Sequence, residues 1–561
     1  MPVTPNDLCD AISSAINQAV AAGDLSLEPA SIPTRVTVER PKNRDHGDFA
    51  TNIALQLSKA ADKPPREIAT VILEHLQNIE GIASVEIAGP GFLNIRLDTA
   101  TSGALVKEIV DAADGYGRSD ALAGSKFNVE FISANPTGPL HLGHTRWAAV
   151  GDALASVLDA AGASVEREFY VNDRGVQITM FGESIRAAAN GRAIPENGYK
   201  GAYIHELTND VVAQNPGILE LPDAQQSELF KEEGYRLQLA QQKETLDTFH
   251  THFDSWISER ELHSNGGVER ALDKLRGQGR VYEADGATWL RTTDFGDDKD
   301  RVLIKADGDL TYFASDCAYY VDKRERGFTV CIYLLGADHH GYVNRLRAVA
   351  ACAGDDPDVN IEVLIGQLVK TMREGQEVKL SKRAGEIVTL TDLVDEVGVD
   401  AARYTLIRYP ADSPLTMDLD LLVKRTNDNP VFYVQYAHAR ISSVLRNANE
   451  LGIDWTSASG ELAFDPALLA EDRENELIGV LREFPRVVAS AAELREPHRV
   501  ARYLEELATA YHRFYDVCRV LPRGDEELTP VHVSRLWLCA AARQTLANGL
   551  AIVGVSAPER M

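Results

Sequence analysis

The chain has 561 residues, of which 44% are hydrophobic, so it is long enough to form roughly three or four domains with their own cores. Lys and Arg number 57 against 84 Asp and Glu, and the net charge of −27 argues against indiscriminate nucleic-acid binding, so any RNA contact should use a local patch. The six scattered cysteines, without a CxxC pair or zinc-like spacing, indicate reduced thiols and no zinc site. A basic leader and membrane-length apolar runs are missing, which predicts a soluble, cytoplasmic protein with no membrane partner.

Residues 1–120 are predicted to form a small α+β domain. A helical start is followed by an expected strand at Arg35–Glu39 and by two helical stretches between Phe49 and Leu76. Val85–Ala88 and Phe92–Leu97 then flank a Gly-Pro-Gly sequence, a pattern typical of a β-hairpin.

Residues 121–390 are predicted to form a Rossmann-like, doubly wound α/β domain. A strand at Phe127–Phe131, a helix at Arg146–Ala160 and a strand at Val165–Val171 open it, and a polar helical insertion at about 194–275 interrupts it. The second half has expected strands at Val302–Ile304, Leu310–Phe313, Val330–Leu335 and Val363–Ile365. Ligands of such sheets bind at the carboxyl ends of the strands.

Residues 391–561 are predicted to form a helix bundle. Apolar residues recur at three- and four-residue spacing through Pro430–Leu445, Leu477–Leu494 and Val500–Val520. Between Leu421 and Met561 there are 16 basic and 19 acidic residues, so this region repels phosphate least.

The tetrapeptide His141-Leu142-Gly143-His144 lies at a predicted strand-to-helix turn. Free backbone N–H groups and the positive end of the helix dipole favour phosphate there, and two histidines add donors. In a simpler interpretation, one histidine caps the helix and the other packs.

A basic loop, Lys379-Leu380-Ser381-Lys382-Arg383, follows the last predicted strand. A mobile loop that closes on a triphosphate would need such lysines. Taken alone, a Lys/Arg-rich pentapeptide is more often a solvated loop.

Together the two segments resemble the HIGH and KMSKS signatures of class I aminoacyl-tRNA synthetases, with Leu142, Leu380 and Arg383 replacing the commoner residues. Longer segments, spread over essentially the whole chain, resemble the bacterial arginyl-tRNA synthetase family. They are His46–Asn52, Ser133–Leu140, Gly336–Tyr342, Asn429–Arg440 and Ser556–Met561.

The resemblance implies that ATP, with Mg²⁺, and L-arginine form arginyl-adenylate, from which arginine passes to a 3′-terminal ribose hydroxyl of tRNA(Arg). No enzyme nucleophile is required, because the chemistry needs mainly positioning and charge neutralisation. The expected catalytic residues are His141, His144, Lys379 and Lys382. The expected ATP-binding residues are Thr137, Gly138, Pro139, His141, Leu142, Gly143, His144, Gly336, Asp338, Lys379, Ser381 and Lys382.

Glu130 and Asp316 match family positions that hold the guanidinium of arginine, which needs paired carboxylate acceptors. Tyr312 is expected beside it, and Asn135, with His339 or His340 near it, at the backbone end of the substrate. The alternative is that Glu130 is an ordinary strand-end carboxylate and Asp316 a helix N-cap. Arginine is distinctive enough that we expect no editing domain.

For tRNA, the resemblance places Phe92 and Asn94 against a D-loop base, whereas a hairpin core position is the alternative for Phe92. The helical domain is implied to bind the anticodon, with Tyr433, Tyr436 and Arg440 as contacts. Aromatic residues at helical spacing are more often buried in a core than exposed to RNA, and we expect a core position for at least one of Tyr433 and Tyr436. Further bundle residues considered for phosphate contacts or base stacking are Arg499, Arg502, Tyr511, Arg513 and Arg519.

Three alternatives remain at this point. A different class I synthetase fits less well. A synthetase specific for cysteine, for example, should show zinc-binding Cys and His residues, which the sequence lacks. A small-molecule ligase would not need the helical domain, and an inactive RNA-binding descendant would be expected to lose signature residues. The family resemblance also suggests a monomer.

Overall fold

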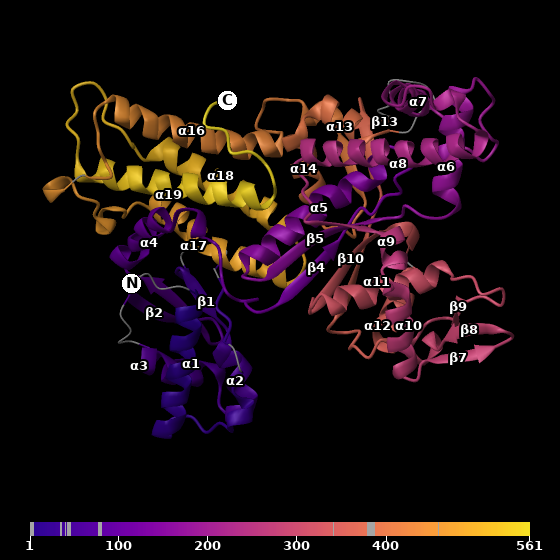
Figure 1. The fold of residues 1–561 in the computed structure, drawn as a ribbon. Coiled ribbons are helices and arrows are strands. Elements are labelled where there is room, and N and C mark those ends of the chain that lie inside the picture. Colours follow the sequence, from indigo (N-terminus) through magenta and orange to yellow (C-terminus); the bar gives the residue numbers. More distant parts are fainter. Residues whose placement is uncertain are drawn as a thin grey trace.

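In the computed structural model of the chain, the residues described are 5–33, 36–39, 41, 46–76, 81–339, 341–378, 388–457 and 459–561. A parallel sheet lies at the centre, with a helix bundle on one side, a helical insertion on the other and a small N-terminal domain below (Figure 1). Among the described helices, none combines the length and apolar character that crossing a membrane requires.

The N-terminal domain is an α+β unit, as predicted, with a core of its own. Its elements are α1 (Pro5–Ala22), β1 (Phe49–Thr51), α2 (Ile53–Ala61), α3 (Pro65–Leu76), β2 (Ile82–Ala88) and β3 (Phe92–Leu97). The strands form an antiparallel sheet in the order β1-β3-β2, so the predicted hairpin is confirmed.

The strand predicted at Arg35–Glu39 is wrong in its described part. Only Glu39 forms an isolated bridge, to Ala50, and Arg35 lies outside the described residues. The strand of this region is β1, which the sequence pattern assigned to a helical stretch. A three-residue strand such as β1 is too short to show the alternation of apolar and polar residues that indicates a strand.

The central sheet is fully parallel, with strand order β11-β10-β4-β5-β6, which confirms a Rossmann-like fold. Its strands and the helix after β4 are β4 (Lys126–Glu130), α5 (Leu142–Ala160), β5 (Ser164–Val171), β6 (Ser255–Ser258), β10 (Val330–Gly336) and β11 (Ile361–Gly366). Parallel strands place their carboxyl ends at one edge, where the candidate residues after β4 and β10 therefore meet.

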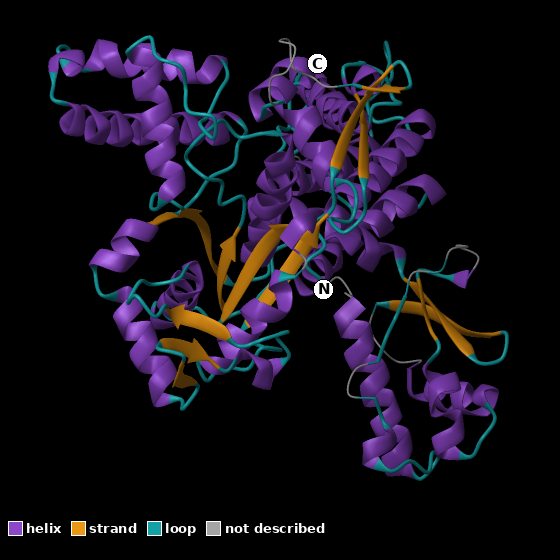
Figure 2. Cartoon of the chain, turned by 90° about the vertical axis from the view of Figure 1, so that its right-hand side faces the viewer, coloured by secondary structure: helices purple, strands orange, loops and turns teal. Residues whose placement is uncertain are grey.

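The helical insertion ends earlier than predicted. It contains α6 (Val176–Ala189), α7 (Ala202–Gln214) and α8 (Asp223–Thr248), which share a small core. Figure 2 shows these helices standing apart from the sheet. β6 lies inside the predicted insertion, 194–275, yet it pairs with β5 and is the edge strand of the central sheet.

The strand predicted at Leu310–Phe313 is wrong, because α11 begins at Tyr312 and Leu310 makes only an isolated bridge to Ile304. The strand at Val302–Ile304 exists, but in a separate antiparallel sheet. The elements here are α9 (Glu259–Ser264), α10 (Gly267–Gly277), β7 (Val281–Ala284), β8 (Ala287–Leu290), β9 (Arg301–Ile304), α11 (Tyr312–Glu325) and α12 (Tyr342–Cys352).

The C-terminal region is a helix bundle, as predicted, preceded by a small sheet in the order β13-β12-β14. Its elements are β12 (Val369–Arg373), β13 (Gln376–Glu377), α13 (Leu390–Val397), α14 (Val399–Ile407), β14 (Leu415–Asp418), α15 (Leu419–Leu422), α16 (Pro430–Glu450), α17 (Asp472–Glu493), α18 (His498–Val517) and α19 (Pro530–Ile552).

The bundle and the central sheet share one continuous core. α4 (Thr99–Ala112), which the predicted boundary at 120 assigns to the N-terminal domain, contributes Leu105, Val106 and Ile109 to that core. Tyr116 continues the contact, since its hydroxyl donates to Leu481 O at 2.7 Å. The central sheet and the bundle are therefore built as one packed unit.

Candidate active site and RNA-binding surfaces

The tetrapeptide His141-Leu142-Gly143-His144 forms the turn into α5. His141 is the N-cap, and its Nδ1 accepts a hydrogen bond from Gly143 N at 3.1 Å. His144 Nδ1 accepts from His141 N at 3.3 Å, and the two rings stack with centroids 3.8 Å apart. One histidine therefore caps the helix, as the simpler interpretation expected, while the other stacks on it.

Both histidines are neutral at physiological pH. Burial lowers the pKa of His141, and burial together with His141 lowers the pKa of His144 to about 3. Because each Nδ1 accepts a backbone N–H, each ring carries its proton on Nε2. The pair offers N–H donors at the positive end of a helix, an arrangement suited to phosphate oxygens.

The loop between β4 and α5 is held by the insertion. Gln242 on α8 donates from Nε2 to Asn135 O at 3.0 Å and to Gly138 O at 2.8 Å. Tyr203 on α7 donates to Thr137 O at 3.1 Å. The side chain of Asn135 stays exposed, so its amide is free for a ligand.

Three carboxylates gather at the carboxyl edge of the sheet. Asp316 lies inside α11, whose N-cap is Thr311, so the N-cap alternative for Asp316 is wrong. Burial, together with nearby Glu130 and Glu259, raises the pKa of Asp316 to about 7. Tyr342 donates to its Oδ2 at 3.1 Å. This half-buried carboxyl has no Lys or Arg ion-pair partner among the described residues, so it suits a cationic ligand.

Glu259 is a pocket residue that sequence reasoning missed. It directly follows β6, is 3% exposed, and accepts from Ser315 Oγ at 3.2 Å. Burial raises its pKa. If the sequence had shown β6 as a strand of the parallel sheet, a carboxylate directly after it would have marked Glu259 as a candidate ligand-binding residue.

Glu130 and Tyr312, also expected to bind arginine, differ in their surroundings. Glu130 accepts from Lys323 Nζ at 2.7 Å and from Ser133 Oγ at 3.0 Å, so its charge is already compensated. Tyr312, one turn before Asp316, is 66% exposed and open to a ligand.

Gly336 ends β10, and Asp338 and His339 follow it at the same edge of the sheet. The Asp338 and His339 side chains are exposed, with His339 Nε2 at 3.5 Å from Asp338 Oδ2. A Cβ at Gly336 would lie 2.7 Å from Asp338 Oδ1, so the exposed Asp338 carboxylate sits directly against the backbone of Gly336. His340 lies outside the described residues.

Lys379, Ser381 and Lys382 lie outside the described residues, so their placement stays a prediction. The chain after them is described and runs beside the histidine turn. Leu142 N donates to Val388 O at 2.9 Å, and His141 forms an isolated antiparallel β-bridge with Thr389. The described chain that resumes at Val388 therefore lies against the candidate phosphate site.

Phe92 opens β3 and is 39% exposed, so the hairpin-core alternative for it is wrong. It lines a hollow of about 470 Å³ on the N-terminal domain, with buried Asn94. His46 and Pro41 also line this hollow. A ring beside an amide is suited to an unpaired base.

Tyr433, Tyr436 and Arg440 share α16. Tyr433 is half-buried against the core, with its hydroxyl donating to Thr509 Oγ1 at 3.2 Å, so the expectation that one of the two tyrosines is core is confirmed. Tyr436 is 38% exposed and stacks between Phe432 and His512. Arg440 lies 4.2 Å from the Tyr515 ring centroid. Tyr511 is fully buried.

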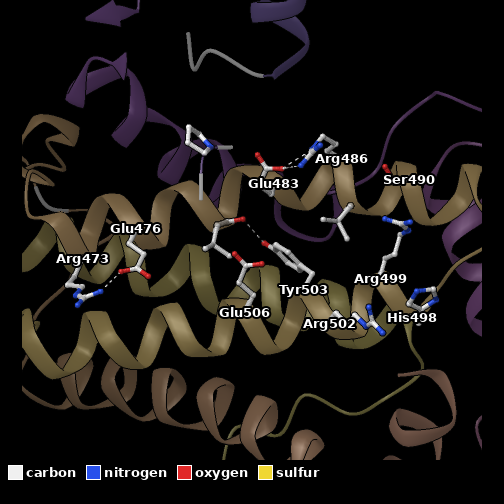
Figure 3. A pocket seen from close by; sticks show the side chains of 13 residues that line it. Arg473, Glu476, Glu483, Arg486, Ser490, His498, Arg499, Arg502, Tyr503 and Glu506 are labelled. Atoms are coloured by element: carbon white, nitrogen blue, oxygen red, sulfur yellow. Dashed lines mark hydrogen bonds and ion pairs between the residues drawn. The ribbon is translucent and has the colours of Figure 1, made fainter. Parts of the chain in front are cut away.

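A charged groove of about 860 Å³ lies between α17 and α18 (Figure 3). Arginines and glutamates point into it from both helices, some of them ion-paired across one turn, as in Arg486–Glu483 at 2.6 Å. Pro41 lines both this groove and the hollow of Phe92, so the two are neighbours. The charged residues lining the groove are Arg473, Glu476, Glu483, Arg486, Arg499, Arg502 and Glu506, and His498 also lines it.

Three family descriptions match the chain in order: "Arginyl tRNA synthetase N terminal domain" at 6–97, "tRNA synthetases class I (R), catalytic domain" at 111–413 and "DALR anticodon binding domain" at 434–561. The chain is 56% identical to an arginine–tRNA ligase of Kineococcus radiotolerans and 58% identical to one of Frankia alni, each over 559 residues and 100% of both chains. The solved Thermus thermophilus arginyl-tRNA synthetase shares the fold, with a TM-score of 0.75 at 22% identity over 99% of this chain and 100% of that one. The chain therefore belongs to the arginyl-tRNA synthetase family.

Proposed function

We propose that this protein joins L-arginine to tRNA(Arg) through arginyl-adenylate, using ATP and releasing diphosphate and then AMP. The reaction is inferred from membership of the family. The observation that carries the choice of arginine is the gathering of Asp316, Glu259 and Glu130 within reach of one another's charge. A guanidinium is a permanently charged, planar fork of donors, and it needs carboxylate acceptors of this kind.

The guanidinium lies between Asp316 and Glu259, because neither has a Lys or Arg ion-pair partner among the described residues. Glu130, already paired with Lys323, completes the negative wall of the pocket. Tyr312 covers the guanidinium from the open side, and Asn135 and His339 hold the backbone end of arginine. Few natural amino acids can satisfy two carboxylates in this way, so no editing step is needed.

ATP lies across the histidine turn. Its phosphates take Nε2–H donors from His141 and His144, and the loop of Thr137, Gly138 and Pro139 borders them, with Leu142 and Gly143 supplying backbone N–H groups. Gly336 and Asp338 receive the ribose, whose hydroxyls donate to the carboxylate. Lys379, Ser381 and Lys382 close on the triphosphate and neutralise the charge that develops when the arginine carboxylate attacks the α-phosphate.

Mg²⁺ accompanies the ATP. In the described part of the chain, no group of three or more His, Cys, Asp or Glu side chains could hold a metal ion, so substrate phosphates and water would supply most ligands. Such an ion adds neutralisation of phosphate charge, and the protein residues do the positioning.

The tRNA would contact three surfaces. A D-loop base stacks on Phe92 with Asn94 beside it, and the anticodon reaches Tyr436, Tyr433 and Arg440. The groove of α17 and α18, which borders the hollow of Phe92 at Pro41, offers arginines to phosphates. We place the reaction in the cytoplasm, consistent with six free cysteines, and expect the protein to act as a monomer.

The Michaelis constant for arginine should depend on pH. Asp316 has a pKa of about 7 in the free protein, and a bound guanidinium favours its ionised form. Below this pH, arginine must displace a proton, so its KM should rise about tenfold per pH unit. Above it, KM should level off. Measuring KM for arginine from pH 5.5 to 8.5 checks this, with KM for ATP as the control; a flat arginine profile would contradict it.

Phe92→Ala should weaken tRNA binding by about 1–3 kcal/mol, the usual contribution of one stacked base. Filter binding of tRNA(Arg) measures this directly. Leu219→Ala removes an exposed apolar side chain from the insertion and is the matched control, expected to leave tRNA affinity unchanged. Equal affinity of the Phe92 variant and the wild type would remove this residue from the RNA surface.

The function is tested by charging. Purified protein is incubated with ATP, bacterial tRNA and each labelled amino acid in turn. Label should enter acid-precipitable tRNA only with arginine, with one AMP formed per arginyl-tRNA. Charging with a different amino acid, or none with folded protein, would overturn the proposal.

A further inference from the structure

Lys323 is a buried charge within the catalytic domain. It lies on α11, and its side chain is 0% exposed. Its Nζ lies 2.7 Å from Glu130 Oε2 and 3.6 Å from Glu168 Oε1. The rings of Tyr319 and Tyr333 face it, with centroids 4.1 and 3.9 Å away. A buried ammonium needs such compensation, because an isolated charge is very costly away from water.

Glu168 has a second cation of its own. Arg326 Nη2 lies 2.6 Å from its Oε2, and Tyr319 donates to its Oε1 at 2.5 Å. Burial alone would raise the pKa of Glu168, but Lys323 and Arg326 hold it below its ordinary value. Arg326 therefore compensates the charge of Glu168, and the shorter of the two Lys323 contacts is the one with Glu130.

Glu130 connects Lys323 to a strained turn. Its Oε1 accepts from Ser133 Oγ at 3.0 Å, and Ser133 Oγ accepts from Tyr170 N at 3.1 Å. Ile132 and Ser133 have φ values of +69° and +42°. A β-branched residue adopts this left-handed conformation only where surrounding contacts hold it, and such turns cluster at ligand sites.

The strained turn leads directly into the substrate loop. Asn135 follows Ser133 by two residues, and its own carbonyl is fixed by Gln242 at 3.0 Å. Hydrogen bonds therefore run from Lys323 through Glu130 to Ser133, and the backbone continues from Ser133 to Asn135. Relaxation of the turn would move the exposed amide of Asn135 relative to the carboxylates.

We propose that Lys323 is a positioning residue for the amino-acid site, which acts through Glu130 to hold the strained Ile132–Ser133 turn and thereby Asn135. The inference rests on the proposed function, since it assigns the loop to arginine. Lys323 itself touches no substrate. Its role is to fix the direction of the Glu130 carboxylate, so that Asp316 and Glu259 are left for the guanidinium.

The test is a double-mutant cycle with Lys323→Met and Glu130→Gln, read by ATP–pyrophosphate exchange in the presence of tRNA. Met keeps the length of the side chain and removes its charge. Lys323→Met should raise KM for arginine about 10- to 100-fold, the scale of one lost bond to a charged group, with KM for ATP changed less than about twofold. Because Lys323 acts through Glu130, the double variant should be no worse than the worse single variant.

The matched control is Arg324→Met. Arg324 lies next to Lys323 on the same helix and pairs with Asp355 at 2.9 Å, away from the pocket. It should leave both Michaelis constants unchanged. If Lys323→Met does not fold, Ser133→Ala removes the next contact in the series and should show the same selective rise for arginine.

An unchanged KM for arginine in folded Lys323→Met, or additive effects in the cycle, would overturn the inference. So would an unchanged KM in the Ser133 variant. Wild-type protein that does not exchange with arginine would instead contradict the proposed function, so the two failures are distinguishable.

Discussion

Asp316→Asn is expected to lower kcat/KM for arginine by about 10²- to 10³-fold. The substitution removes the charge of a half-buried carboxylate that faces the guanidinium, and breaking such a pair costs about 2–5 kcal/mol. ATP–pyrophosphate exchange measures the loss. KM for ATP should stay within about twofold, because Asp316 lies on α11 and not on the histidine turn.

Glu325→Gln is the matched control for Asp316→Asn. Glu325 ends the same helix and forms an exposed ion pair with Arg270 at 3.4 Å. An exposed pair contributes little, so exchange with arginine should be unchanged. If Asp316→Asn retained full activity while folded, the carboxylate pocket would not be the arginine site.

Arg403→Ala is expected to destabilise the protein by about 3–5 kcal/mol. Arg403 is fully buried on α14 and donates to Asp152 Oδ2 at 2.6 Å. It also donates at 2.9 Å to Phe249 O, His250 O and Thr251 Oγ1. Truncation leaves these acceptors unpaired between the sheet and the bundle, so the midpoint of thermal unfolding should fall by several degrees.

Arg118→Ala is the control for Arg403→Ala. Arg118 pairs with Asp159 at 2.8 Å on the exposed surface, where loss should cost under about 1 kcal/mol. Differential scanning calorimetry compares the two variants with the wild type. Equal unfolding midpoints for all three would show that Arg403 does not tie the two domains together.

The histidine turn was predictable because its signals are local. A strand, a histidine turn and an Ala-rich helix follow one another within the stretch from Lys126 to Ala160. The group of carboxylates proposed for arginine depends on elements distant in sequence. β6 has only four residues and follows a 26-residue helix, so no alternation of apolar and polar residues is visible in it. Glu259, the residue after β6, could not be predicted for the same reason.

The helix of Asp316 was misjudged for a different reason. Leu310 to Phe313 is short and apolar enough to resemble a strand, yet Thr311 accepts from Ala314 N and caps α11. Lys323 gave no signal at all, since a lysine in a sequence is expected to be solvated. Its partner Glu130 lies 193 residues away, and only the fold brings the two together.

The most direct test of the account compares arginine, lysine and citrulline in ATP–pyrophosphate exchange, each with tRNA present and absent. Citrulline keeps the shape of arginine without its charge, and lysine keeps a charge without the planar fork. With tRNA present, exchange should occur with arginine and fall by about 10³-fold or more with the other two. Comparable exchange with citrulline would contradict the central claim that paired carboxylates select the substrate by its guanidinium.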